Sequence, residues 1–304
     1  MRVGVSLTTA LDAGGAREGA RWLIERAAAA RDADLDSLFV GDHHVTGPGP
    51  YYQNVPILAR MLAEWGDRPA GALFLLPLWH PVLLAEQIGT LASIHQGRFI
   101  MQCAGGRDDF QFSGMGVPKG QRPSRFEQSL SIMRQLWDGE RLTHEGRWDF
   151  EEAAIAPVPP EPVEVWIGAM ASPAIDRAAR LGDGWLASPG LTIAQASATS
   201  AEYLERCEAH GRPPQAVAVR RDVYVGASDE EAAATTGPLL ERGYRGMDPS
   251  ALAIGGPETV AAHFAALAEA GYTDVIVRNV AVDQPSALAS ISRLAEVRER
   301  VADA

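Results

Sequence analysis

The chain has 304 residues, of which 46% are hydrophobic and 22% are charged, a balance typical of a globular protein. Its net charge of −12 argues against nucleic acid or an anionic membrane as the main partner, because both select positively charged surfaces. Two cysteines are too few for a disulfide framework, and neither a signal peptide nor a membrane span is indicated, so we expect a cytoplasmic protein.

Short apolar runs alternate with longer helical patterns along the chain. The first half predicts strands at 3–7, 37–40, 70–75 and 99–103, and helices at 18–32, 55–64 and 81–94. A long loop follows from Gly105, and Ser124 with Glu127 three residues later predicts a capped helix start. The second half predicts strands at 163–167, 184–186, 217–225 and 274–277, and helices at 173–181, 193–210, 229–234 and 257–270, before a last helix.

Two stretches break this alternation. Residues 139–162 include a proline run and predict an extended excursion, and residues 238–254 are irregular. Eight strands, each followed by helical sequence, predict one α/β domain over residues 1–304. We expect a (β/α)8 TIM barrel with insertions after strand four and helix four and near 238–254. An open Rossmann sheet is disfavoured, because no G-x-G-x-x-G follows the first strand.

In such a barrel the active site lies at the carboxyl ends of the strands. Asp42, His43 and His44 follow the second strand, where a histidine can act as an acid or base and a carboxylate can orient it. An exposed polar turn is the alternative interpretation. A metal site with His80 and His95 is disfavoured, because neighbouring strand residues point to opposite faces and no metal-ligand spacing is present.

Two loops of small residues are candidates for binding a cofactor phosphate. The first joins the fifth strand to a helix, so its N–H groups and the helix dipole favour an anion; it consists of Gly168, Ala169, Met170, Ala171 and Ser172. The second runs from Cys103 through Gly105 to Arg107, an arginine that can bind phosphate through two hydrogen bonds. An ordinary turn and a flexible loop are the alternatives. Cys103 itself reads as a buried strand residue. Trp79 is expected to line a ring-sized pocket or to pack in the core.

Several motifs follow one another along most of the chain, from residue 3 to about residue 277. They are Ser37-Leu38-Phe39-Val40-Gly41-Asp42-His43-His44, Leu76-Pro77-Leu78-Trp79-His80-Pro81-Val82, Thr90-Leu91 with Gln96-Gly97-Arg98-Phe99, Gly116-Val117-Pro118, Leu136-Trp137, and Arg177-Ala178-Ala179 with Gly182-Asp183-Gly184-Trp185. In order and spacing they resemble the bacterial luciferase-like monooxygenase family, which also includes deazaflavin-dependent dehydrogenases and reductases.

The resemblance implies roles for individual residues. His43 matches an active-site histidine of the family, and Asp42 is expected to orient it. Ala72 and Leu73 match a bulged third strand that often carries a non-prolyl cis peptide bond and backs the flavin ring. Met170, Ala171 and Ser172 match a phosphate-binding turn, but Met170 and Ala171 replace the acidic and hydroxyl residues that luciferase has there. Gly105 replaces an arginine, for which Arg107 would have to substitute. His44 and Trp79 are assigned to the substrate pocket.

The resemblance implies a flavin-dependent monooxygenase, in which reduced FMN reacts with oxygen and the peroxide attacks a small organic substrate. His43 would act as general base or proton donor, residues 238–254 would form a mobile lid, and a separate reductase would supply reduced flavin. The main alternative is a dehydrogenase or reductase that transfers hydride with the deazaflavin coenzyme F-420. A non-catalytic flavin-binding protein and a metal-dependent hydrolase are the others. We expect a homodimer or a larger assembly.

Overall fold

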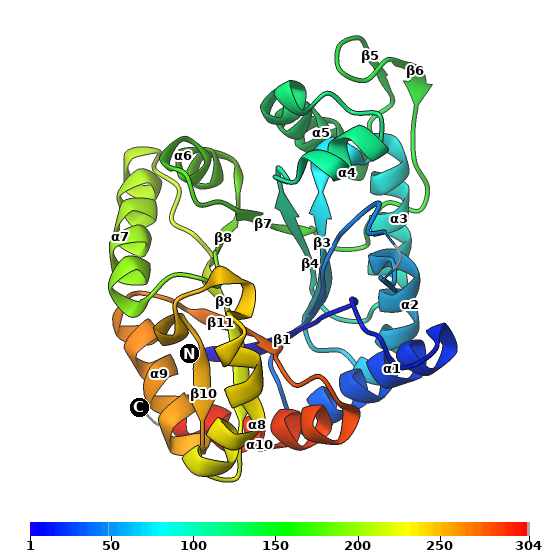
Figure 1. The fold of residues 1–304 in the computed structure, drawn as a ribbon. Coiled ribbons are helices and arrows are strands. Elements are labelled where there is room, and N and C mark those ends of the chain that lie inside the picture. The colour runs from blue at the N-terminus through cyan, green and yellow to red at the C-terminus, as the bar shows by residue number, and fades with distance from the viewer. Residues whose placement is uncertain (48, 303–304) are drawn as a thin grey trace.

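Eight parallel strands close into a barrel in the computed structural model, which describes residues 1–47 and 49–302 (Figure 1). In order around the barrel, the strands are β1 (Arg2–Leu7), β2 (Leu38–Val40), β3 (Ala70–Leu75), β4 (Phe99–Ala104), β7 (Glu164–Gly168), β8 (Gly184–Ala187), β9 (Ala216–Val225) and β11 (Asp274–Asn279). The pairing of β8 with β9 and of β11 with β1 completes the circle. The predicted TIM barrel is confirmed.

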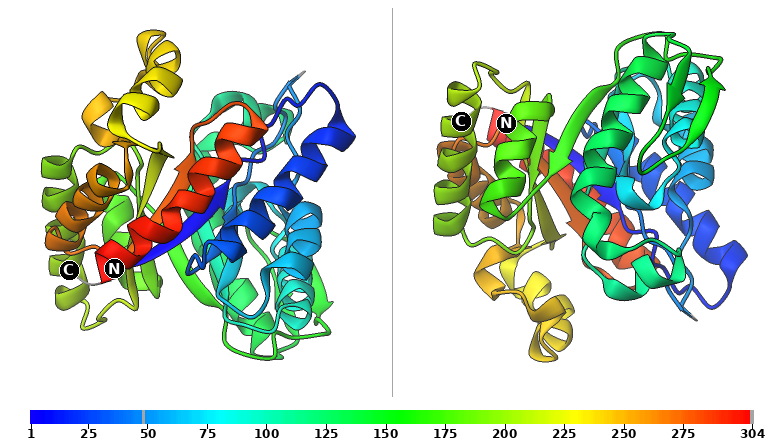
Figure 2. Two further views of the ribbon diagram at one scale, coloured as in Figure 1. Left: turned by 90° about the horizontal axis from the view of Figure 1, so that it is seen from below. Right: turned by 90° about the horizontal axis from the view of Figure 1, so that it is seen from above.

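Helices connect consecutive strands and cover the outside of the barrel (Figures 1 and 2). They are α1 (Ala16–Asp32), α2 (Asn54–Trp65), α3 (Pro81–Ile94), α5 (Arg122–Trp137), α6 (Ser172–Leu181), α7 (Ile193–Ala209), α8 (Asp229–Glu241), α9 (Pro257–Glu269) and α10 (Gln284–Ala302). A short 3-10 turn, η1 (Leu76–Leu78), lies between β3 and α3.

Alternation along the strands divides the buried side chains into two layers. Val40, Ala72 and Cys103 belong to the large outer cluster between the strands and the helices. A separate cluster fills the middle of the barrel: Phe39, Ile100, Trp166, Leu186, Ala216, Ala218 and Ile276. These side chains fill the interior, as in other TIM barrels, so a ligand would have to bind at an end of the barrel.

The insertion after β4 is more ordered than the predicted loop. It contains α4 (Asp109–Gly114) and a 3-10 turn, η2 (Lys119–Gln121). The predicted helix start at Ser124 is wrong, because α5 begins at Arg122 and has a proline in its first turn, where proline is favoured. The Ser124 hydroxyl, in the first turn of α5, instead donates to the carbonyl of Gln121, the residue before the helix, at 3.0 Å.

The second insertion leaves the barrel, as expected, as an antiparallel hairpin of β5 (Leu142–His144) and β6 (Phe150–Ala153). The hairpin lies against α5, because the Trp148 indole donates to the Ser129 hydroxyl at 3.0 Å and the Arg125 guanidinium stacks 3.8 Å from the Trp148 ring centroid. The chain returns across α3 at Gly89, where a Cβ would lie 2.4 Å from the Pro157 carbonyl oxygen.

The third insertion is only partly irregular. Helix α8 continues through the exposed Pro238, so the predicted helix end at 234 is too early. Two 3-10 turns follow, η3 (Tyr244–Gly246) and η4 (Pro249–Ala251), and a short strand, β10 (Ala253–Gly255), pairs with β9 outside the barrel circle. In both views of Figure 2, α8 projects from the body of the molecule on the side away from the β5–β6 hairpin.

Candidate active site

The loop after β2 sends consecutive side chains in different directions, as the alternation predicts. His43 lies beside two aromatic rings: its ring centroid is 5.2 Å from that of Tyr51 and 5.7 Å from that of Phe110. His44 packs against the Trp79 ring at 5.5 Å. The sequence placed both histidines at the carboxyl end of β2, and the structure gives them separate environments.

The Asp42 carboxylate lies next to the imidazole of His44 and not that of His43. Its Oδ2 accepts hydrogen bonds from the Leu75 backbone N–H at 2.8 Å and from the Trp79 indole at 2.7 Å. Its Oδ1 lies 3.2 Å from His44 Nε2, although the two atoms are not aligned as a hydrogen bond. The expectation that Asp42 orients His43 is therefore wrong. The Asp42 side chain is 1% exposed and ties the end of β2 to the end of β3.

The backbone around His43 is held from the following segments. The His43 carbonyl accepts from the Gln53 amide at 3.2 Å, and the His44 N–H donates to Gln111 Oε1 at 2.9 Å. Gln111 belongs to α4 and also donates to Asp108 at 3.0 Å. The insertion after β4 therefore fixes the position of the imidazole, a contribution that no local pattern in the sequence indicates.

Strand β3 differs from the expectation based on the resemblance. It pairs with β4 in continuous register from Ala70 to Leu75, so no bulge is present. Within residues 1–47 and 49–302, the cis peptide bond is Ala156–Pro157, and the Ala72–Leu73 bond is trans. Leu73 packs against the interior cluster, whereas Ala72 faces the helices. Only Leu73 of this pair can therefore offer a side chain to a ligand inside the barrel.

The two predicted phosphate loops lie side by side, because Ala104 at the end of β4 pairs with Gly168 at the end of β7. A Cβ on Gly168 would lie 3.5 Å from both the Ala104 Cβ and the Cys103 carbonyl oxygen, and one on Gly105 would lie 3.4 Å from the Arg122 side chain. The structure thus brings together the two loops that the sequence singled out separately.

Side chains contribute unequally to these loops. Cys103 faces the outer layer, and burial raises the pKa of its thiol, so its side chain is remote from any ligand in the barrel. Arg107 is 81% exposed and Met170 is 62% exposed, while Ala169 is buried. Ser172 begins α6 after Ala171, which provides no side-chain cap. Arg122, which sequence analysis missed, donates to the Gly106 carbonyl at 2.8 Å.

A charged group that sequence analysis also missed lies at the carboxyl ends of β9 and β11. Asp222 pairs with Arg278 in the strand register, and an Asp222 oxygen accepts from the Arg278 guanidinium. The Tyr244 hydroxyl donates to the same oxygen at 3.1 Å and accepts from Arg278 at 2.8 Å. Burial is the main cause that raises the pKa of Tyr244 to about 12, so this phenol stays protonated. In the sequence, the run Arg220-Arg221-Asp222 inside an otherwise apolar strand could have indicated this charged group.

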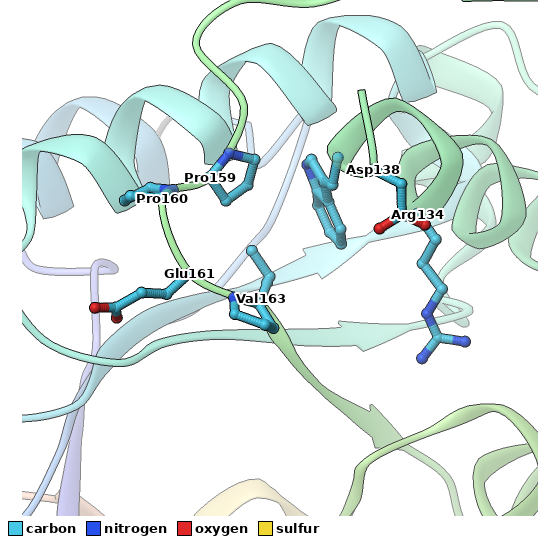
Figure 3. Close-up of a pocket in the computed structure, with 8 residues that line it drawn as sticks. Arg134, Asp138, Pro159, Pro160, Glu161 and Val163 are labelled. Carbon is cyan, nitrogen blue, oxygen red and sulfur yellow. The ribbon is translucent and has the colours of Figure 1, made fainter. Parts of the chain in front are cut away.

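Two surface hollows lie at the opposite end of the barrel. One, of about 360 Å³, is formed where α5 ends and the chain enters β7; Figure 3 shows its lining residues Arg134, Asp138, Pro159, Pro160, Glu161 and Val163. The other, of about 380 Å³, lies where α2 and α3 end. Both are at the amino ends of the strands, the end that in TIM barrels serves stability.

Residues 1–47 and 49–302 contain no group of three histidine, cysteine or acidic side chains arranged to hold a metal ion. No helix among these residues is both long and apolar enough to cross a membrane.

Curated relatives match part of the chain. An F420-dependent glucose-6-phosphate dehydrogenase of Nakamurella multipartita is 30% identical over 178 residues, which are 55% of this chain and 52% of the relative. One of the same description from Intrasporangium calvum is 29% identical over 190 residues, 57% of this chain and 55% of the relative. The chain spans about half the length of the curated relatives that it matches.

Solved structures match the whole fold at low identity. Monooxygenase RslO1 from Streptomyces bottropensis has a TM-score of 0.87 at 19% identity, covering 97% of this chain and 98% of that one. The oxygenating constituent of 3,6-diketocamphane monooxygenase of Pseudomonas putida, in complex with FMN, has a TM-score of 0.83 at 20% identity, covering 98% of each chain. An F420-dependent secondary alcohol dehydrogenase has a TM-score of 0.80 at 16% identity, covering 99% of this chain and 98% of that one.

The family described as "Luciferase-like monooxygenase" matches residues 1–251 of the sequence. This match covers most of the barrel, including the loops after β2, β4 and β7. With the closed barrel and the full-length structural matches, it establishes the family: the chain belongs to the luciferase-like monooxygenases.

Proposed function

We propose that this protein is a deazaflavin-dependent oxidoreductase that transfers hydride between the coenzyme and a small alcohol or carbonyl compound. The observation that carries the proposal is the description shared by the curated relatives, which are F420-dependent dehydrogenases. The position of His43 at the carboxyl end of β2, next to Tyr51 and Phe110, supports it, because hydride transfer from an alcohol needs a nearby proton acceptor.

The residues at the carboxyl ends of β4 and β7 fit a coenzyme with a phosphate-bearing tail. Ala104 and Gly168 are small and only half-buried, so they leave part of the backbone accessible, and the exposed Arg107 could bind an anion at the edge of these loops. Deeper inside, the amide of Gln102 is buried and has no partner for its Nε2. A bound ring system with carbonyl oxygens would supply that acceptor, which a buried donor requires.

The chain itself would move the proton. As the C–H bond of the alcohol breaks and its hydride leaves, an imidazole nitrogen of His43 takes the hydroxyl proton, and in the reverse direction it returns that proton to the carbonyl oxygen. A bound deazaflavin supplies the hydride acceptor or donor. Tyr51 and Phe110 restrict the orientation of the imidazole, and the bond from Gln111 to the His44 N–H fixes the backbone that carries it.

The FMN-dependent monooxygenase reading is the second candidate, and the high TM-scores to two monooxygenases favour it. These structures share less than 25% identity with this chain, however, and so bear on the fold more than on the cofactor. The loops after β4 and β7 offer mostly backbone to a phosphate, and either cofactor carries one.

Turnover under argon separates the two candidates. The purified protein is incubated with oxidised deazaflavin and a panel of small alcohols, or with reduced deazaflavin and carbonyl compounds, and coenzyme absorbance is followed. We expect consumption without oxygen and a loss of about 10²- to 10⁴-fold in kcat for His43→Ala. His210→Ala, which changes an exposed histidine at the end of α7, serves as the control. Turnover only with reduced FMN and oxygen would contradict the proposal.

A further inference from the structure

An excess of positive charge remains at the carboxyl ends of β9 and β11. Two arginines, Arg278 and Arg245, lie within 4.0 Å of one carboxylate, Asp222, which is completely buried, and Arg220 stands two positions before Asp222 on the same face of β9. Asp222 is already engaged by Arg278 and Tyr244, and Arg245 lies 3.8 Å from the same oxygen. Asp222 supplies one negative charge to a region that holds three guanidiniums, of which Arg245 is exposed to solvent and Arg278 is paired.

Arg220 is the group that lacks a counterion. Its Nε is buried without a hydrogen-bond partner, and in the described part of the chain no carboxylate lies within ion-pair distance of it. The residue as a whole is half-buried and not fully enclosed. Burial and the neighbouring Arg278 both lower its pKa, because a second positive charge in a poorly solvated place is unfavourable.

The arginines and His43 have a common neighbour. Tyr51 packs against the His43 ring, and its phenol feels the charges of Arg220 and Arg278, which act to lower its pKa against the larger effect of burial. In the barrel, β11 and β2 both pair with β1, so Arg278 and the loop that carries His43 lie at the same edge with one strand between them. Strand β8 separates the arginines on β9 and β11 from the loops that end β4 and β7.

We propose that Arg220 and Arg278 bind an anionic group of the substrate, so that the substrate is a small alcohol or carbonyl compound carrying a carboxylate, phosphate or sulfonate. This inference rests on the proposed function for the reacting group, but the anion site itself does not require it. Asp222 and Tyr244 position Arg278, and Arg220 supplies the unneutralised charge.

Binding of inorganic phosphate to the full chain tests the site without turnover. Thermal unfolding is followed over a range of phosphate concentrations, with chloride at equal ionic strength as the reference, in the absence and presence of saturating deazaflavin. We expect saturable stabilisation in both conditions. Arg220→Gln should weaken the phosphate affinity about 10- to 100-fold, and Arg220→Lys should recover part of it, because it restores the charge.

Arg242→Gln is the control, since Arg242 lies exposed at the end of α8 in the neighbouring segment and should leave phosphate binding unchanged. Equal stabilisation of the wild type and Arg220→Gln, or none beyond that by chloride, would overturn the proposal. Loss of phosphate binding when deazaflavin is added would also overturn it, by assigning the arginines to the coenzyme. Arg220-dependent phosphate binding in a protein that neither binds nor reduces deazaflavin would retain the anion site and reject the proposed function.

Discussion

Replacement of Asp42 by alanine should destabilise the fold more than it affects the chemistry directly. The change removes the acceptor of two donors, the buried Leu75 N–H at 2.8 Å and the partly buried Trp79 indole N–H at 2.7 Å. A buried donor left without a partner costs about 1–3 kcal/mol and a partly buried one costs less, so Asp42→Ala should lower the free energy of unfolding by about 1–4 kcal/mol. Because a domain is stable by only about 5–15 kcal/mol, this loss is easily measured.

Urea unfolding followed by circular dichroism is the assay, with Asp42→Asn as a milder variant that keeps one acceptor oxygen. The matched control is Asp109→Ala, whose carboxylate is 87% exposed and pairs with Lys119, and which should change stability by no more than about 0.5 kcal/mol. If Asp42→Ala and Asp109→Ala have the same unfolding free energy, Asp42 does not hold β2 to β3 and this interpretation of the site fails.

Two further variants test the barrel interior and the outer layer. Trp166→Ala should lower the free energy of unfolding by about 3–5 kcal/mol, because it leaves a cavity in the cluster of side chains inside the barrel. If calorimetry gives a loss of unfolding free energy below about 1 kcal/mol, this cluster is not tightly packed. Burial, and next the neighbouring Arg221, lowers the pKa of His263 to about 4 from its ordinary value of 6.5. The unfolded chain therefore binds more protons between these values, and stability should fall as the pH falls from 6.5 toward 4. His263→Gln should show a smaller fall in guanidinium midpoint over this range, and an unchanged pH slope would exclude His263 as a source of it.

Hydrophobic periodicity was sufficient to predict the barrel. Strand β3 and helix α3 begin and end where the pattern indicated, because each alternates or repeats over its whole length. Pro238 shows the limit of local rules: a proline usually ends a helix, but here it is exposed near the end of α8, and the helix passes through it.

The candidate site was predicted less completely, because its contacts connect residues far apart in the chain. The sequence indicated His43 and the loops after β4 and β7, since each directly follows a strand. It assigned Asp42 to the adjacent His43. In the structure, Leu75 and Trp79, which flank the 3-10 turn η1, donate hydrogen bonds to the Asp42 carboxylate, and no local pattern in the sequence indicates this contact.

The arginines at the ends of β9 and β11 were overlooked for a related reason. Arg220 and Asp222 were visible as charges in a buried strand, but their significance depends on Arg278 and Tyr244, which lie 56 and 22 residues from Asp222 in the chain. The third strand shows the opposite error, in which a resemblance predicted a bulge that continuous pairing with β4 excludes.

The central claim is that the carboxyl end of this barrel binds a deazaflavin. Equilibrium titration of the purified protein with the deazaflavin coenzyme and with FMN, followed by quenching of tryptophan fluorescence, tests it most directly. We predict saturable quenching by the deazaflavin, with an affinity at least about tenfold higher than that for FMN. A higher affinity for FMN, or no saturable binding of the deazaflavin, would contradict the claim.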